Sequence, residues 1–170
     1  MTRARPTLLI WIGRAAQFGF IARDIRRALP ALAVLASDGF GGPALAHDSA
    51  HALDGVRYVR LVDYSRPDTA LTRLVASYRD AGFGEITDQA VLAYDAVLLL
   101  AQAMRERGAE REAIRVWVAS IGRFRPPFPG LSGPIAFPTG GDRAPLYVLY
   151  EIPTGSSVNS PTAHAASATR

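Results

Sequence analysis

Short runs of consecutive apolar residues alternate with segments of helical spacing in the first third of the 170-residue chain. Residues 7–13 (TLLIWIG) form a continuous β-rich run, which is typical of a strand covered on both faces in a parallel sheet. Residues 15–29 repeat apolar side chains at helical spacing. Further strands are predicted at 32–37 and 56–62, and a short helix between them at 44–53. This order predicts an α/β fold with a parallel sheet and right-handed crossovers.

The pattern changes after residue 62, where three helices are predicted at 66–84, 87–108 and 110–122. The second of these has an N-cap candidate at Thr87 and is apolar nearly all round. Such a helix has to be buried on several sides, and this chain offers little to cover it. We therefore expect partial exposure of three of its side chains and self-association of the chain through them: Val91, Leu98 and Leu99.

The chain closes with a segment rich in glycine and proline, residues 130–152 (GLSGPIAFPTGGDRAPLYVLYEI). It predicts a hairpin: a short strand at Ile135, a Gly-Gly-Asp turn, and a second strand of alternating apolar residues that ends at Ile152. The tail from Thr154 is small, polar and aperiodic, and we expect it to be disordered.

Composition and charge exclude several classes of function. The formal net charge is +4, and all 19 basic residues are arginines spread along the whole chain, without the clustering that nucleic-acid binding requires. The absence of cysteine excludes disulfides, thiolate metal sites and a cysteine nucleophile. The apolar run at the start is short and lacks a convincing signal-peptide cleavage site. The apolar run around Asp95 is too short to span a bilayer, so no membrane anchor is expected.

The motifs that could carry enzymatic chemistry are incomplete. His47 and His51 stand at the i, i+4 spacing of a zinc site, but Asp48 replaces the glutamate of zinc peptidases and no third ligand follows. This favours a solvated helix with two surface histidines. The glycine-rich turns lack the lysine of a phosphate-binding loop, and no serine stands in a Gly-x-Ser-x-Gly elbow. We therefore expect no enzymatic activity, no metal and no cofactor.

Arg14 and Asp38 are the candidate binding residues. Each is the first charged residue after a predicted buried strand, so both are expected at the carboxyl edge of the sheet, where open α/β folds bind ligands. Together they could hold a zwitterion, with Asp38 binding an ammonium and Arg14 a carboxylate. A plain salt bridge across the strand ends fits the same spacing. Spacing leaves both interpretations open.

Five segments together resemble the carboxyl-terminal half of a type I periplasmic binding protein, of the leucine/isoleucine/valine-binding, branched-chain amino-acid ABC transporter type. The resemblance covers residues 7–154, and its most specific pieces are the YDAV helix and the GLSGPIAF…GD…YVLYEI ending. The segments are LLIWIGRAAQFGFIARDIRRA, LAVLASDGF, LDGVRYVRL, LAYDAVLLLAQAM and FPGLSGPIAFPTGGDRAPLYVLYEI.

The resemblance implies a partial type I fold, with a three-layer α/β lobe and a second lobe that is largely missing. Residues 1–62 would form the second half of the carboxyl-terminal lobe, and residues 63–129 a helical crossover segment of the amino-terminal lobe. Residues 130–153 would be the hairpin that returns to the carboxyl-terminal lobe, and residues 154–170 the tail. The family binds small molecules between its lobes and delivers them to a membrane permease, in the periplasm or anchored by lipid outside the cell.

The resemblance also assigns ligand contacts. The family's acidic contact for the ligand's α-ammonium falls on Asp38, and its aromatic contact after the preceding strand falls on Arg14. The arginine departs from the family pattern and favours a ligand with an extra acidic group over an aliphatic amino acid. The implied function is the solute-binding component of an ABC importer for amino acids or similar molecules. The alternative is a cytoplasmic ligand-sensing module on the same fold.

Overall fold

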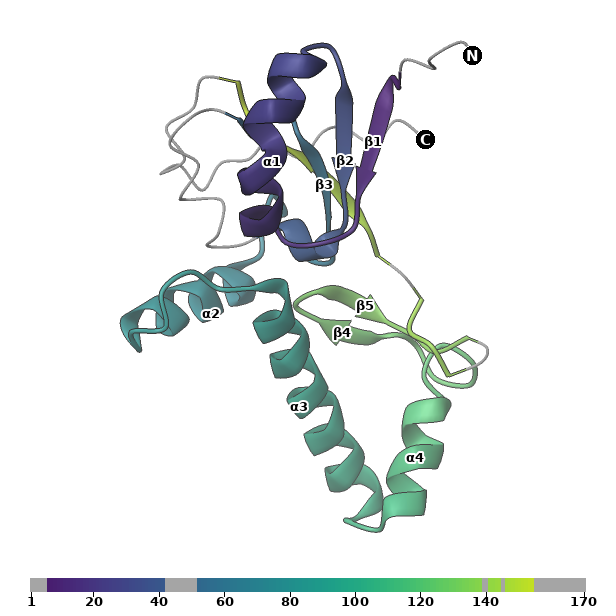
Figure 1. Ribbon diagram of the computed structural model, residues 1–170. Helices are drawn as coiled ribbons and strands as arrows, with labels where there is room; N and C mark the ends of the chain where they lie inside the picture. The colour runs from purple at the N-terminus through teal and green to yellow at the C-terminus, as the bar shows by residue number, and fades with distance from the viewer. Residues whose placement is uncertain (1–5, 42–51, 139–140, 145, 155–170) are drawn as a thin grey trace. The chain divides into compact units, whose positions relative to one another are not determined.

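The computed structural model describes residues 6–41, 52–138, 141–144 and 146–154 (Figure 1). The chain divides into two compact units. The sheet unit comprises the residues up to Arg60 together with those from Tyr147 onward, and the helical unit comprises Leu61–Leu146. Each unit has its own hydrophobic core.

A four-stranded sheet forms the centre of the sheet unit, in the spatial order β1-β2-β3-β6. The first three strands are parallel, and β6 runs antiparallel to β3. This confirms the predicted α/β class with a mostly parallel sheet. The elements are β1 (Leu8–Trp11), α1 (Ala15–Ala28), β2 (Ala33–Ala36), the short 3₁₀ helix η1 (Asp38–Phe40), β3 (Arg57–Arg60) and β6 (Val148–Glu151).

The helix α1 covers one face of this sheet, as Figure 1 shows. Leu9 and Trp11 of β1 pack toward it, whereas Leu8 and Ile10 point to the other face and are 51% and 63% exposed. The prediction that β1 is covered on both faces is therefore wrong. Strand side chains alternate between faces, and α1 can cover only one of them.

A chain of aromatic rings runs through the covered side of the sheet. Phe18 of α1 contacts Trp11 and Phe40, with ring centroids 5.3 and 5.8 Å apart. The chain continues from Phe40 to Tyr58 and from Tyr58 to Tyr150, at 6.0 and 5.9 Å. These contacts, of which Phe18–Phe40 is edge-on and the others are tilted, join β1, α1, η1, β3 and β6, and each adds to the free energy of burial. Phe40 is fully buried and so fixes the turn that follows β2.

Three helices and a hairpin make up the helical unit: α2 (Thr69–Asp80), α3 (Asp88–Arg107), α4 (Arg111–Ala119), β4 (Phe128–Gly130) and β5 (Gly133–Ile135). All three helices fall within the predicted ranges. Each begins with a side-chain cap, because Asp68, Thr87 and Glu110 accept hydrogen bonds from backbone N–H groups of the first turn. The predicted N-cap at Thr87 is thus confirmed.

The predicted closing hairpin is wrong in its strand pairing. The strand at Ile135 pairs with Phe128, so β4 and β5 form a hairpin around a four-residue turn. The later strand, β6, pairs with β3 of the sheet unit. Local turn signals mark where strands begin and end, but pairing depends on contacts distant in sequence. The assignment of these segments to lobes of a longer protein stays a prediction.

A buried carboxylate holds the turn between β4 and β5. Asp95 of α3 is 1% exposed and accepts hydrogen bonds from the N–H groups of Leu131 and Ser132, at 2.7 and 2.8 Å, and from the Ser132 hydroxyl. The approach is so close that a Cβ on Gly130 would lie 2.7 Å from the carboxylate. Arg143 donates to the hydroxyl and the carbonyl oxygen of Ser132. Asp95 thereby fixes the hairpin against α3.

The two sides of α3 differ in burial. Val91 and Leu99 are buried at 0% and 5% exposure, which corrects the prediction that they are partly exposed. Leu99 packs in a cluster with Trp117 of α4, and Val91 packs in a cluster with Leu71 of α2. Leu98 is 41% exposed, as predicted. The helix is therefore covered by α2, α4 and the hairpin on one side only.

Two further predictions concern residues that lie mostly outside the described ranges. The expected tail lies almost wholly outside the described residues, as does most of the predicted helix at 44–53. Within the described part of the chain, no helix combines the length and the apolar character that crossing a bilayer requires.

We predict that Asp95→Ala lowers the free energy of unfolding by about 3 kcal/mol, because it leaves buried N–H groups without an acceptor. Asp95→Asn should cost less, because the amide keeps one acceptor oxygen. Urea denaturation followed by circular dichroism measures both. Asp24→Ala, at an exposed ion pair on α1, is the control and should change little. An unchanged urea midpoint for Asp95→Ala would contradict the role assigned to the carboxylate.

Candidate functional site

The two predicted binding residues lie at the carboxyl ends of neighbouring strands. Trp11 at the end of β1 stands beside Ala36 at the end of β2 in the parallel register. Arg14 follows β1 and caps α1, and Asp38 follows β2 and begins η1. Both residues are exposed. The sheet register therefore brings these two charges to one edge of the sheet, as the sequence predicted.

The loops that carry the two charges are joined by a hydrogen bond. The N–H of Gly13 donates to the hydroxyl of Ser37 at 3.3 Å. The next turn is equally close, because a Cβ on Gly39 would lie 3.5 Å from the carbonyl oxygen of Gly13. Sequence analysis did not single out Ser37, although it stands directly before Asp38. Its hydroxyl sets the distance between the two loops.

Arg14 is held by its backbone, which leaves its side chain available. Its N–H donates to the Gln17 side chain at 3.2 Å, and its carbonyl oxygen accepts from the N–H groups of Gln17 and Phe18. Among the described residues, the structure records no ion pair for the guanidinium of Arg14 or for the carboxylate of Asp38. The salt-bridge interpretation is therefore not the arrangement observed.

The electrostatics of this edge suit a ligand with both signs of charge. The first turn of α1 contains no acidic residue, so its backbone N–H groups and Arg14 together favour a carboxylate. Asp38 stands on the neighbouring loop and can accept hydrogen bonds from an ammonium group. The arrangement can bind and orient a small zwitterion.

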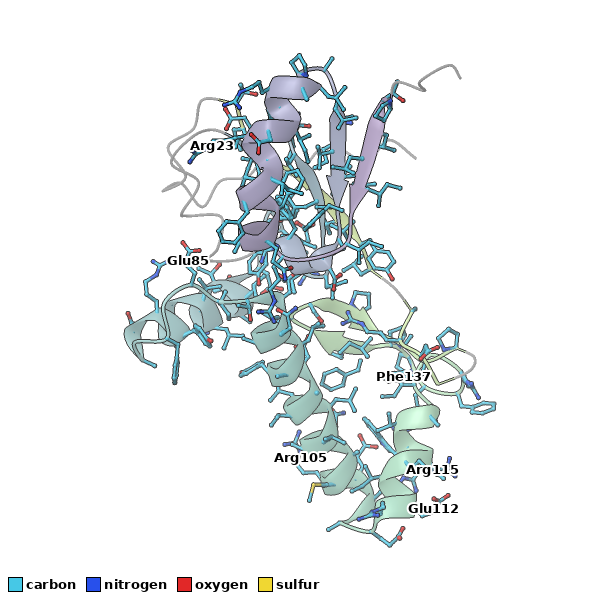
Figure 2. The ribbon with its side chains drawn as sticks, viewed as in Figure 1. Arg23, Glu85, Arg105, Glu112, Arg115 and Phe137 are labelled. Carbon is cyan, nitrogen blue, oxygen red and sulfur yellow. The ribbon has the colours of Figure 1, made fainter. Side chains whose placement is uncertain are left out.

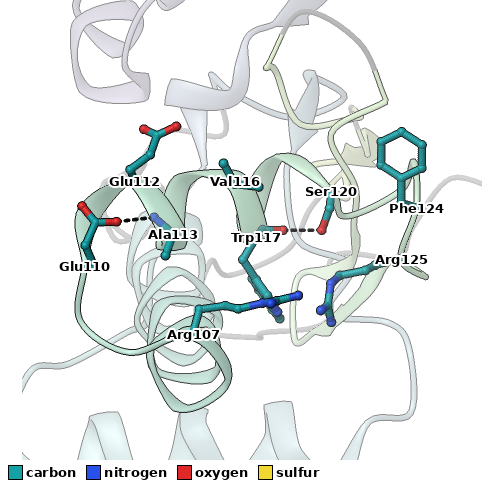
Figure 3. A pocket seen from close by; sticks show the side chains of 9 residues that line it. All are labelled: Arg107, Glu110, Glu112, Ala113, Val116, Trp117, Ser120, Phe124 and Arg125. Atoms are coloured by element: carbon teal, nitrogen blue, oxygen red, sulfur yellow. Dashed lines mark hydrogen bonds between the residues drawn. The ribbon is translucent and has the colours of Figure 1, made fainter.

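A concave region lies in the helical unit, at the corner between α3 and α4, with a volume of about 680 Å³ (Figure 3). The indole N–H of Trp117 donates to Glu106 at 2.7 Å, and Arg125 donates to the same carboxylate oxygen at 2.9 Å. The guanidinium of Arg125 also lies over the Trp117 ring, 5.1 Å from its centroid. Sequence analysis missed this corner, since its residues are spread over 20 positions. Its polar groups bind one another, so it stabilises the helix corner.

The candidate zinc ligands His47 and His51 lie outside the described residues. Within the described ranges, no group of three or more histidine, aspartate and glutamate side chains could hold a metal ion.

No protein-family model and no curated protein matches the sequence. Solved structures do match the fold. A leucine-binding protein from Thermotoga maritima matches with a TM-score of 0.72 and 24% identity, over 89% of this chain and 43% of that chain. A branched-chain amino acid transporter substrate-binding protein from Streptococcus pneumoniae, solved with isoleucine, matches with a TM-score of 0.73 and 18% identity, over 92% and 44%.

A third match is the solute-binding protein of an ABC transporter from R. palustris, solved with benzoate, with a TM-score of 0.69 and 18% identity, over 86% of this chain and 40% of that chain. At such identities the likeness shows the fold alone. The chain is thus similar in fold to part of a type I periplasmic binding protein. It spans less than half the length of each of these proteins.

We predict that Glu106 stabilises the α3–α4 corner only in its ionised form. The hydrogen bond from Trp117, with further ones from Gln102 and Arg125, lowers the pKa of Glu106 below its ordinary value of 4.5. Because the pKa is lower in the folded chain, this stabilisation is present at neutral pH and is lost as the pH falls below about 4.5.

Urea denaturation of Glu106→Gln and the parent chain, measured across pH, tests this expectation. The substituted chain should be less stable at pH 7, and the difference should shrink at acid pH. Glu85→Gln, at an exposed position just before α3, controls for the loss of one negative charge. A difference between Glu106→Gln and the parent that stays constant down to pH 3 would contradict the assignment.

Proposed function

We propose that this chain is the ligand-recognising part of a solute-binding protein of an ABC importer, corresponding to the carboxyl-terminal half of such a protein. The observation that carries the proposal is the shared fold with binding proteins for leucine, isoleucine and benzoate, together with two exposed charges at the carboxyl edge of the sheet. The function is binding, and no chemical step is involved.

The proposed ligand is a small carboxylate, in particular an amino acid with a second acidic group. Asp38 accepts hydrogen bonds from the α-ammonium, and Arg14 with the first turn of α1 binds a carboxylate. An arginine in this place recognises a carboxylate through two parallel hydrogen bonds, which an aliphatic side chain cannot use. Glutamate should therefore bind better than leucine.

The remaining contacts are proposed to come from outside this chain. In the proposed complex, a second lobe closes over the ligand, and the loaded protein delivers it to a membrane permease. Lobe closure excludes water and strengthens the charge–charge contacts. The described chain offers one edge of such a site, so its own affinity is expected to be weak, in the millimolar range that corresponds to about 4 kcal/mol.

The proposal predicts a distinct response for each of the two charges. Asp38→Ala should weaken binding of glutamate and leucine about tenfold, because a charge-assisted hydrogen bond is lost, and should leave benzoate, which has no ammonium, unchanged. Arg14→Tyr should weaken glutamate and benzoate and shift the preference toward leucine. Chemical-shift titration of the isotope-labelled chain with the three ligands measures these affinities.

Arg23→Ala is the matched control, because Arg23 is an exposed arginine farther along the same helix (Figure 2). It should leave every affinity unchanged. If Asp38→Ala binds all three ligands as tightly as the parent chain, the assignment of the ammonium contact is wrong. If the three ligands shift only resonances of the helical unit, the sheet edge is not the binding site.

A further inference from the structure

Ser37 lies between the two charges of the sheet edge and does not have the usual role of a serine in its position. It stands directly before η1, where a serine oxygen commonly accepts a hydrogen bond from the first turn of the helix. Ser37 makes no such bond. Its oxygen accepts the N–H of Gly13 instead, at 3.3 Å, from the loop that follows β1. The Ser37 side chain is therefore held beside the loop that carries Arg14.

The hydroxyl proton of Ser37 has no acceptor in the described part of the chain. A serine hydroxyl can accept two hydrogen bonds and donate one. The N–H of Gly13 uses one of the two accepting positions, and among the described residues the structure records no group that accepts the proton. The backbone of Ser37 is fixed as well, because its N–H donates to Trp11 at 2.9 Å and its carbonyl oxygen accepts from Phe40 at 3.0 Å. The hydroxyl is thus a positioned donor that the fold does not use.

This donor lies close to both candidate binding residues. Asp38 is the next residue along the chain, and Arg14 directly follows Gly13, which holds the hydroxyl. The turn of η1 is near, since a Cβ on Gly39 would lie 3.9 Å from the Ser37 oxygen. Ser37 is half-buried, so its hydroxyl is partly shielded from water and still open to a small ligand. Shielding of this kind strengthens a hydrogen bond to a charged group.

We propose that Ser37 is a third ligand contact of the sheet edge, whose hydroxyl donates to the carboxylate that Arg14 binds. The inference rests on the proposed function, because it requires a ligand at this edge. A carboxylate offers about four lone-pair positions, so it can accept from a guanidinium and a hydroxyl together. Ser37 then selects for the carboxylate and Asp38 for the ammonium. Two successive residues thereby recognise opposite charges of one zwitterion.

Two simple ligands separate this role from the other roles that Ser37 could have. Benzoate has a carboxylate and no ammonium, whereas propylamine has an ammonium and no carboxylate. If the hydroxyl donates to the carboxylate, its removal weakens benzoate and leaves propylamine unchanged. If its second accepting position binds the ammonium, the reverse holds. If Ser37 serves only to space the two loops, its removal affects both ligands alike.

Chemical-shift titration of the isotope-labelled chain with glutamate, benzoate and propylamine tests the proposal. Ser37→Ala should weaken glutamate and benzoate about tenfold, because a hydrogen bond to a charged group is lost, and should leave propylamine unchanged. Ser37→Thr keeps the hydroxyl and should restore the affinity for benzoate. Asp38→Ala should show the opposite pattern, with propylamine weakened and benzoate unchanged. Ser77→Ala, at an exposed serine of α2, is the matched control and should change no affinity.

The outcomes distinguish this inference from the proposed function. If the parent chain binds none of the three ligands, or binds them without dependence on Arg14 and Asp38, the proposed function fails and the inference fails with it. If binding depends on Arg14 and Asp38 but Ser37→Ala binds benzoate as tightly as the parent chain, the inference on Ser37 alone is overturned. Equal weakening of benzoate and propylamine would also overturn it, since Ser37 would then act only through the spacing of the loops.

Discussion

A helix covers only one face of the four-stranded sheet, and the rest of the sheet unit depends on this constraint. Among the described residues, α1 is the helix that packs on this sheet, and it buries Leu9, Trp11 and the inward residues of the other strands. The aromatic chain from Trp11 to Tyr150 fills the space beneath it. Phe40 anchors the turn after β2 in this core, and Asp38 lies in the same turn, so the buried Phe40 fixes its position. The position of the candidate site is thus a consequence of how the core is packed.

The helical unit is organised around a polar contact instead. Asp95 is buried because it satisfies the N–H groups of the β4–β5 turn, which would otherwise be unpaired in an apolar setting. This orients α3, with Val91 and Leu99 toward the cores and Tyr94 and Val97 toward solvent. The single carboxylate between Gln89 and Met104 therefore decides which side of the helix is inside. The exposed side is formed by apolar side chains, among them Val97 and Leu98.

The two surfaces described here differ in the chemistry that they offer. The sheet edge presents single charges on tightly held loops, which suits a small polar ligand. The exposed side of α3 is apolar and carries no charge from Gln89 to Met104, apart from the buried Asp95. The fold is that of proteins more than twice as long, in which more chain is available to cover such surfaces. The proposed ligand-binding edge and the apolar side of α3 thus belong to separate units.

The sequence by itself determined the elements and the edge residues. The periodicity of apolar residues predicted the helices α1 and α3, and the residue type at Thr87 predicted an N-cap. Arg14 and Asp38 were expected at the edge of the sheet, because a charged residue that follows a strand has to reach solvent. These features depend on residues within a few positions of each other. Tertiary structure alone decided which face of β1 is covered, the pairing of β5 with β4 instead of β6, and the partners of Asp95. The physical reason is that strand pairing and side-chain burial depend on contacts between residues as far apart in sequence as Arg57 and Glu151, and local patterns do not encode them.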